Sequence, residues 1–206
     1  MYISDPQNRR VQQWLQGAHT GQTILENLPA YGIAQDDEGS LYVSARTDAQ
    51  VIKWRKGKAE WQVVLNAGLN LASNLFVDRQ RTVYVTDESY RRIMKIAEGE
   101  DVGTIMVGGS TGGGDHQLGV PTSVLVDKFG NVYVTDSANH RVMCWPPWSQ
   151  GVGKPGTLIV GDHDSGSRSD QLSAPYDLAF DLDENLYVLD TDNQRVQKFL
   201  IDKNLV

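Results

Sequence analysis

The sequence has 206 residues and is short of cysteine, of long apolar runs and of helical periodicity. Its one cysteine, Cys144, excludes an internal disulfide and offers no zinc-binding spacing, and its apolar neighbours (VMCW) favour a buried small side chain. No run of about 18 apolar residues is present, so no membrane-spanning helix is expected. The first residues, MYISDPQNRR, hold no apolar segment of the kind that a secretory signal needs, which makes a cytoplasmic location the default expectation.

Basic residues are also few. The chain has 19 Lys and Arg against 26 Asp and Glu, a formal net charge of −7 at pH 7. Binding to a polyanion needs clustered Lys and Arg, so this balance argues against RNA as a partner. The segment GGSTGGGD lacks the lysine of a phosphate-binding loop, and no helical pattern follows it, which argues against nucleotide binding as well.

The sequence does contain an internal repeat. Five similar segments recur along the chain at nearly even intervals, and their spacing is typical of one supersecondary unit per repeat. The copies are YISDPQNRRV, YVSARTDAQV, YVTDESYRRI, YVTDSANHRV and YVLDTDNQRV, beginning at Tyr2, Tyr42, Tyr84, Tyr133 and Tyr187. Four of the tyrosines follow a short apolar run, an acidic residue and a polar turn, the pattern of a hairpin.

Each repeat predicts four antiparallel strands, which in the fourth repeat are Val124–Val126, Val132–Thr135, Arg141–Trp145 and Thr157–Val160. Four strands in such a unit are typical of a β-propeller blade. We therefore predict an all-β chain that forms one β-propeller domain, residues 1–206, with about five blades. Their predicted bounds are 1–28 (partial), 29–68, 69–109, 118–161 and 172–206 (partial).

The chain begins at a second strand and stops during or just after a third. This pattern predicts an incomplete six-bladed ring, either a piece of a longer propeller or a chain that closes with a partner. Open strand edges would favour edge-to-edge association with another copy.

The repeat resembles the NHL repeat of six-bladed, TolB-like propellers, on the pattern of an early proline, an acidic residue and YVxDxxNxRVxxW. Residues 118–145 and 172–199 match it closely, whereas Ala45, Gln50 and Tyr90 depart from it. The resemblance covers nearly the whole chain and extends to the NHL domains of tripartite-motif proteins.

The short polar side chains of the motif suit the turn between second and third strands, and the arginine is placed to pair with the aspartate or with carbonyls. We predict a structural role for this set; a ring of arginines that binds an anion is the alternative. The set is Asp5, Arg10, Asp87, Arg92, Asp136, Asn139, Arg141, Asp190, Asn193 and Arg195.

Loops that differ between blades are better candidates for function. Two long ones, 108–120 and 161–174, lie on the predicted top face and are rich in glycine and acidic residues. No cofactor is expected, but these loops could supply ligands for Ca²⁺ or Zn²⁺; solvated loops are the alternative. The candidate side chains are Asp115, His116, Asp162 and His163.

A second candidate site is the mouth of the central channel, where one residue of each first strand is expected. These are Gly32, Asn74, Ser123 and Asp177. The resemblance implies a divalent metal near this level in related lactonases and amidating lyases, which makes Asp177 a further metal candidate beside His116 and His163. A third candidate is Trp148, displayed on a loop that two prolines interrupt, where it could anchor a partner or fold back on its blade.

These observations favour a non-catalytic scaffold that binds a protein, a peptide or a small polar ligand on its loop face. One alternative, implied by the tripartite-motif resemblance, is the substrate-recognition part of a larger ubiquitin ligase whose catalytic part lies on other sequence. Another is a metal-dependent lyase or lactonase.

Overall fold

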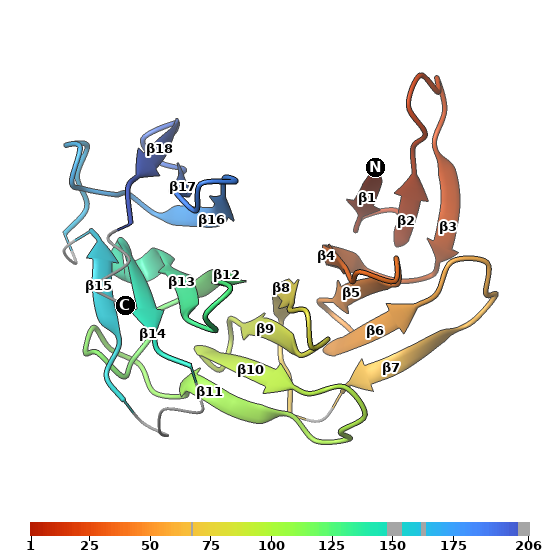
Figure 1. The fold of residues 1–206 in the computed structure, drawn as a ribbon, viewed down its shortest axis with the longest axis horizontal. Helices are drawn as coiled ribbons and strands as arrows, with labels where there is room; N and C mark the ends of the chain where they lie inside the picture. The colour runs from red at the N-terminus through yellow and green to blue at the C-terminus, as the bar shows by residue number, and fades with distance from the viewer. Residues whose placement is uncertain (67, 148–153, 162–163, 202–206) are drawn as a thin grey trace. The chain divides into compact units, whose positions relative to one another are not determined.

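The computed structural model describes residues 1–66, 68–147, 154–161 and 164–201, and antiparallel strands dominate it (Figure 1). The predicted all-β class is confirmed: five sheets of three or four strands follow one another along the chain. The sheets are β1–β2–β3, β4–β5–β6–β7, β8–β9–β10–β11, β12–β13–β14–β15 and β16–β17–β18.

The strand bounds are as follows: β1 Tyr2–Asp5, β2 Arg10–Gln13, β3 Gln22–Glu26, β4 Ala30–Gln35, β5 Leu41–Ala45, β6 Gln50–Trp54, β7 Trp61–Leu65, β8 Ala72–Val77, β9 Val83–Asp87, β10 Arg92–Ile96, β11 Thr104–Gly108, β12 Pro121–Val126, β13 Val132–Asp136, β14 Arg141–Trp145, β15 Thr157–Val160, β16 Pro175–Phe180, β17 Leu186–Asp190 and β18 Arg195–Phe199. A single 3₁₀ turn, Ser137–Asn139, is the helical structure of the described residues. Among them no helix is long and apolar enough to cross a membrane.

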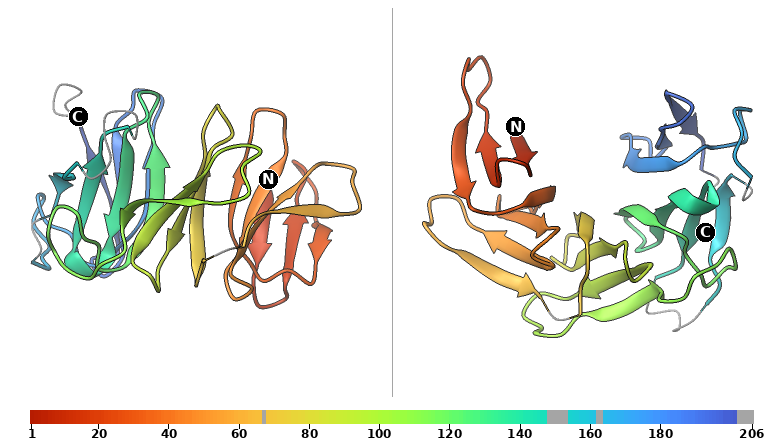
Figure 2. Two further views of the ribbon diagram at one scale, coloured as in Figure 1. Left: turned by 90° about the horizontal axis from the view of Figure 1, so that it is seen from below. Right: turned by 180° about the vertical axis from the view of Figure 1, so that it is seen from behind.

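Each sheet is a meander in which strands that follow one another along the chain lie side by side. In the fourth sheet Tyr133 lies opposite Leu125 on one side and Cys144 on the other. The second sheet, drawn in orange, has the same order and is seen from two further directions in Figure 2. The strands begin and end close to their predicted positions because the alternation of apolar residues marks them directly.

The turn between the second and third strands of four sheets, and the β1–β2 turn of the first sheet, share one feature. The residue just before the later strand has a left-handed backbone with φ of 51° to 54°, and none of the five is glycine. These residues are Arg9, Ala49, Arg91, His140 and Gln194. A left-handed residue costs a non-glycine side chain about 1–2 kcal/mol, so the contacts described below must offset that strain.

By its internal contacts the chain divides into two compact units. The first comprises Met1–Asp87 with Lys95–Thr104, and the second Glu88–Met94 with Ile105–Val206. The boundary passes through the third sheet. Each unit has its own core of stacked sheets.

In the first unit, Val11 of β2 joins Leu41 and Val43 of β5 in one buried cluster. In the second unit, Tyr133 and Val142 of the fourth sheet join Leu186 and Val188 of the fifth. The ring of Tyr133 meets that of Phe180 edge to face, with centroids 5.2 Å apart, an arrangement that favours aromatic pairs. In each unit, therefore, a face of one sheet packs on the sheet before it.

Candidate functional site

The four predicted channel-mouth residues lie at a bulge in the first strand of the second, third, fourth and fifth blades. In β12 the register shifts between Pro121 and Ser123. The N–H of Ser123 donates to Oγ1 of Thr135 over 2.7 Å, and the hydroxyl of Thr122 donates to the carbonyl of Pro175 over 3.3 Å. The Thr135 hydroxyl thus replaces the ladder bond that the bulge removes.

The first unit has the same arrangement. The register shifts between Ala30 and Ile33, and Oγ of Ser44 accepts from the N–H of Gly32 over 2.8 Å. One blade later the N–H of Asn74 donates to Oγ1 of Thr86 over 2.9 Å. A hydroxyl two residues after the repeat tyrosine is therefore the side chain that holds this strand, a regularity that sequence reasoning overlooked.

The structure brings together two of the predicted mouth residues. Ser123, which is buried, donates from its hydroxyl to Oδ1 of Asp177 over 2.7 Å. The same oxygen accepts the N–H of Leu178 over 2.9 Å, while Asp177 itself is exposed. The pair places an oriented carboxylate at the bulged end of β16, where it can accept hydrogen bonds from a polar ligand. Asn74 lies in the first unit, at the bulge of β8.

The motif residues of the fourth blade hold the long loop 108–120 in place. Oδ1 of Asp136 accepts the N–H of Gly119 over 2.7 Å, and Oδ2 accepts from Arg141 over 3.0 Å and from Asn139 over 2.7 Å. Asn139 also donates to the carbonyl of Gly112 over 2.9 Å. A single carboxylate therefore connects the turn, the third strand and the loop.

The guanidinium of Arg141 is used entirely within the chain. Its two terminal nitrogens donate to the carbonyls of Gly113, Gly114 and Gln117 over 2.7 to 3.1 Å. The side chain is 1% exposed. Anion recognition, the alternative interpretation of the motif, would need donors that point to solvent, and Arg141 does not present any.

The fifth blade repeats these contacts at the equivalent positions. Asp190 accepts from the N–H of Ser173 over 2.6 Å, from Asn193 over 2.9 Å and from Arg195 over 2.7 Å. The terminal nitrogens of Arg195 donate to the carbonyls of Ser167, Arg168 and Gln171 over 2.7 to 2.9 Å. The two loops therefore have the same backbone arrangement although their sequences differ.

The pKa of Asp190 reflects this environment. Burial alone would raise it, but the hydrogen bonds from Ser173, Asn193 and Arg195 favour the charged carboxylate more strongly. The pKa of Asp190 is therefore lowered below its ordinary value.

The remaining motif residues differ in how they are used. Asp5 accepts from Arg10 over 2.8 Å in the first blade, with both side chains partly exposed. Asp87 accepts the N–H of Asn70 over 3.2 Å. Arg92, in the second unit, stacks over the ring of Tyr90 at 4.8 Å, so the departure from asparagine at position 90 adds a cation–π contact.

Of the predicted loop ligands, Asp115 and His116 are exposed side chains of the loop 108–120. Asp162, His163 and Trp148 lie outside the described residues. Within the described ranges no group of three or more His, Cys, Asp or Glu side chains is arranged to hold a metal ion, and this includes the surroundings of Asp177 and His116.

Sequence reasoning also missed a cavity of about 250 Å³ in the first unit, at the end of the strands opposite to the motif turns. Charges of both signs line it, which suits a small polar molecule better than an apolar one. The lining includes Tyr42, Lys53, Arg55, Arg81, Glu98 and Glu100.

An ion-pair network forms one wall of this cavity. Nζ of Lys53 lies 3.3 Å from Oδ2 of Asp36 and 3.4 Å from Oε1 of Glu98, and Nη1 of Arg81 lies 3.2 Å from the same Glu98 oxygen. The hydrogen bond from Arg81 lowers the pKa of Glu98. Burial would raise the pKa of Asp36, but the N–H of Ser40 and the Lys53 ammonium lower it overall.

The sequence did contain a signal for this network. A lysine eleven residues after the repeat tyrosine occurs in three blades, at Lys53, Lys95 and Lys198, and Cys144 takes that position in the fourth. Nζ of Lys198 contacts Oδ2 of Asp181 over 3.0 Å, as Lys53 contacts Asp36. Asp36 and Asp181, the acidic residues before Tyr42 and Tyr187, are therefore part of the scaffold.

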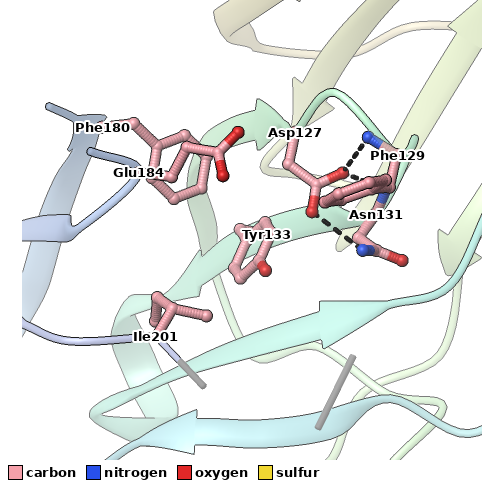
Figure 3. A pocket seen from close by; sticks show the side chains of 7 residues that line it. All are labelled: Asp127, Phe129, Asn131, Tyr133, Phe180, Glu184 and Ile201. Carbon is pink, nitrogen blue, oxygen red and sulfur yellow. Dashed lines mark hydrogen bonds between the residues drawn. The ribbon is translucent and has the colours of Figure 1, made fainter. Parts of the chain in front are cut away.

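A small pocket in the second unit is lined by Tyr133, the residue that pairs with Cys144 (Figure 3). Asp127 accepts there from the N–H groups of Phe129 and Asn131 over 2.9 and 2.8 Å, and Tyr133 and Phe180 form the apolar side. Its volume is about 20 Å³, which is room for about one water molecule. This pocket is too small for a ligand.

No protein-family model matches the chain, and no curated protein matches it. Solved structures do resemble it. An auxiliary nutrient binding protein from Bacteroides ovatus has a TM-score of 0.76 at 15% identity, covering 97% of this chain and 55% of that one. A nidogen/laminin complex has a TM-score of 0.73 at 18% identity, covering 97% of this chain and 75% of that one. A gluconolactonase from Xanthomonas campestris has a TM-score of 0.67 at 22% identity, covering 84% of this chain and 59% of that one.

These likenesses define the class of fold. The similar structures are β-propeller proteins, and the five meandering sheets of this chain are built in the same way. The chain spans less than two thirds of the length of two of the three structures.

Proposed function

We propose that the chain is an NHL-type β-propeller scaffold, without catalytic activity of its own, that binds a protein, a peptide or a small polar ligand on its loop face. In the second unit the loop face consists of residues 109–119, 137–140, 164–174 and 191–194. On this face Arg141 and Arg195 bind backbone carbonyls, and the side chains of residues 113–116 and 167–170 are exposed.

One observation carries this proposal. Each long loop presents four consecutive exposed residues, 113–116 and 167–170, between partly buried residues that the motif holds. Their sequences, GGDH and SRSD, differ completely while the backbone contacts are the same. Variable side chains on a fixed backbone are typical of a recognition surface.

The similar structures support binding in general terms. One is named as an auxiliary nutrient binding protein and another as a nidogen/laminin complex. Recognition of substrates for a larger ubiquitin ligase would use the same face, but no contact described above favours it over other partners.

Selection of a ligand from a phage-displayed peptide library, followed by calorimetric titration, tests the proposal. We expect Asp115→Ala with His116→Ala, or Arg168→Ala, to weaken the selected peptide about tenfold, a loss of about 1.4 kcal/mol. The matched control is Asp183→Ala, an exposed aspartate in the β16–β17 turn at the other end of the strands. A peptide that binds equally well to all these variants would show that the loop face is not the site.

The lactonase-like alternative has a separate test. One of the similar structures is a gluconolactonase, and the Ser123–Asp177 pair lies at the strand end where we predicted a channel-mouth ligand. A rise in the melting temperature with Ca²⁺ or Zn²⁺ that Asp177→Asn abolishes would favour that activity over the scaffold.

A further inference from the structure

The cavity beside Lys53 has walls from two neighbouring sheets. The second sheet contributes Lys53 near the end of β6, Arg55 just after β6, and residues 62–64 of β7. The third sheet contributes Arg81, two residues before β9, and residues 97–101 of the β10–β11 turn. All of these residues belong to the first unit. The described lining includes no residue of the first or the fifth sheet, so the cavity owes nothing to the first and last strands of the chain.

Two of the three cations at the cavity are already paired. The ammonium group of Lys53 contacts Asp36 and Glu98, and the Lys53 side chain is 8% exposed. The same ammonium group lies 4.9 Å from the centroid of the Tyr42 ring. Arg81 shares Glu98 with Lys53. These contacts hold the wall of the cavity together, so neither cation is an unpaired charge that a ligand could neutralise.

Arg55 is the cation that is left over. It is exposed, and among the residues that the structure describes its guanidinium has no hydrogen bond or ion pair. The side-chain amide of Gln62, on the same sheet, likewise has no hydrogen bond within that part of the chain. A guanidinium presents a planar fork of donors that matches both oxygens of a carboxylate. A carboxylate bound in this cavity would therefore meet Arg55 without displacing an existing partner.

The β10–β11 turn supplies unpaired carboxylates from the other sheet. Asp101 is exposed, and its side chain makes no hydrogen bond or ion pair within the described ranges. Glu100, also exposed, accepts the N–H of Ala97 over 3.4 Å, which leaves further acceptor positions on its two oxygens. An ammonium group, with three donors and one positive charge, suits such carboxylates. The two sheets thus present unpaired charges of opposite sign to the same cavity.

The balance of charge at the cavity disfavours a ligand of a single sign. The formal charges of the lining cancel, because three cations lie with three carboxylates. These are Lys53, Arg55, Arg81, Glu98, Glu100 and Asp101. Asp36, which contacts Lys53 from outside the lining, adds one more negative charge. A simple anion would therefore meet an excess of negative charge, and a simple cation would leave Arg55 unpaired. A molecule with one carboxylate and one ammonium group satisfies Arg55 and Asp101 together.

The size of the cavity limits the ligand to a small molecule. Its volume of about 250 Å³ lies below the range of about 300–1,000 Å³ that is usual for pockets with drug-sized ligands. Val63, Val64 and Ala97 add apolar surface to the lining, which can take a short aliphatic group. A free α-amino acid has the three parts that this lining matches: a carboxylate, an ammonium group and a small side chain.

We propose that this cavity binds a free α-amino acid as a zwitterion, with its carboxylate on Arg55 and its ammonium group on Asp101. The side chain of the amino acid lies against Val63 and Val64. No residue of the loop face lines the cavity, so this is a second site, and the inference does not rest on the proposed function.

Chemical-shift titration of the isotope-labelled full chain tests the proposal, with L-alanine, L-valine and L-glutamine as the probes. We expect saturable shifts of the backbone amides of residues 97–101 with at least one of the three. For each amino acid that binds, the analogue that lacks the amino group and the analogue that lacks the carboxylate are titrated as well. For valine these are isovalerate and isobutylamine. Each analogue is expected to bind about tenfold more weakly, because it leaves Asp101 or Arg55 without a partner.

Two pairs of variants separate the cavity from the surface around it. Arg55→Gln and Asp101→Asn each remove one charge from an exposed side chain and are expected to weaken binding about tenfold. The matched controls Arg79→Gln and Glu60→Gln remove the same charges from exposed residues outside the lining, and they should bind as the parent does. Arg168→Ala, on the loop face, should also bind the amino acid unchanged, so a failure of the loop-face proposal leaves this one standing.

Three results would overturn the proposal. The first is the absence of saturable shifts with all three amino acids. The second is an analogue with a single charge that binds as tightly as its amino acid. The third is a loss of binding in the two matched controls that equals the loss in the variants at positions 55 and 101, with the fold of each variant verified by its amide spectrum.

Discussion

Nε of Arg141 donates to Oδ2 of Asp136 over 3.0 Å, and the two side chains are 1% and 0% exposed. The equivalent pair in the fifth blade, Arg195 and Asp190, is bonded over 2.7 Å, but Arg195 is 29% exposed. The two pairs make the same contacts with the chain at two degrees of burial. They therefore allow the effect of burial on a repeated ion pair to be measured within one molecule.

Replacing the arginine with methionine separates the two environments. Arg141→Met leaves the buried Asp136 carboxylate without its cation and is expected to lower the free energy of unfolding by about 3–5 kcal/mol. Arg195→Met is expected to cost less, because Arg195 is partly exposed and its ion pair is already screened by water. Urea unfolding followed by tryptophan fluorescence measures both. The exposed pair Arg168–Asp170 provides the control, since Arg168→Met should change stability by less than about 1 kcal/mol.

Acid should destabilise the chain in a defined range. The pKa of Asp190 is lowered by folding, so the folded state favours its deprotonated form. The stabilisation that Asp190 contributes is fully present above about pH 4, the pKa of an aspartate in the unfolded chain. It is lost as the pH falls through the lower pKa that Asp190 has in the folded chain. Melting temperatures between pH 7 and pH 2 should therefore decline below about pH 4. In Asp190→Asn we expect a lower stability at pH 7 and a shallower acid decline, whereas Asp183→Asn should follow the parent.

Two glycines with the same backbone conformation should respond differently to alanine. Gly161 has φ +84°, and an added Cβ would lie 2.2 Å from the carbonyl oxygen of His140. Gly57 has φ +81° with nothing within 4 Å of its added Cβ. Gly57→Ala should cost about 1 kcal/mol for the left-handed backbone alone. Gly161→Ala should cost about 2–4 kcal/mol because the turn must also shift. Equal losses in urea unfolding would mean that the close contact relaxes freely.

The cysteine should be unreactive until the chain unfolds. Burial raises the pKa of the Cys144 thiol to about 12, with Asp127 adding to the effect, so almost no thiolate is present at pH 8. We expect labelling with a disulfide reagent at pH 8 to be slow in the native chain and fast in urea. Rapid labelling of the native chain would show that the β13–β14 hairpin opens readily. Labelling of the exposed thiol in Lys56→Cys serves as the positive control.

The alternation of apolar residues and the repeat tyrosine were enough to predict the strands and their order. The sequence also placed the Asp, Asn and Arg of the motif near the turn. It could not show which carbonyls Arg141 would bind, because those atoms lie on residues 113–117 and come close only when the sheet forms.

Other features depend on register rather than on residue type. The bulge that brings Ser123 to Asp177 follows from a shift in strand pairing, and the spacing of the repeat does not predict such a shift. The cavity beside Lys53 needs two turns from different sheets to meet. The left-handed residue in each turn is Arg, Ala, His or Gln, so no glycine marked it.

The hydrogen bonds from Arg141 and Arg195 to backbone carbonyls within residues 112–117 and 166–171 have a further consequence. Because the arginine bonds carbonyl oxygens, which every residue possesses, the contacts that position these segments are indifferent to the side chains between them. The four residues inside each segment, 113–116 and 167–170, are therefore expected to be exchangeable between the two blades, whereas Gly112, Gly166, Gln117 and Gln171 at the ends are not. A designer could replace GGDH with SRSD, or with another tetrapeptide, and expect the hydrogen bonds to Arg141 and Arg195 to be kept.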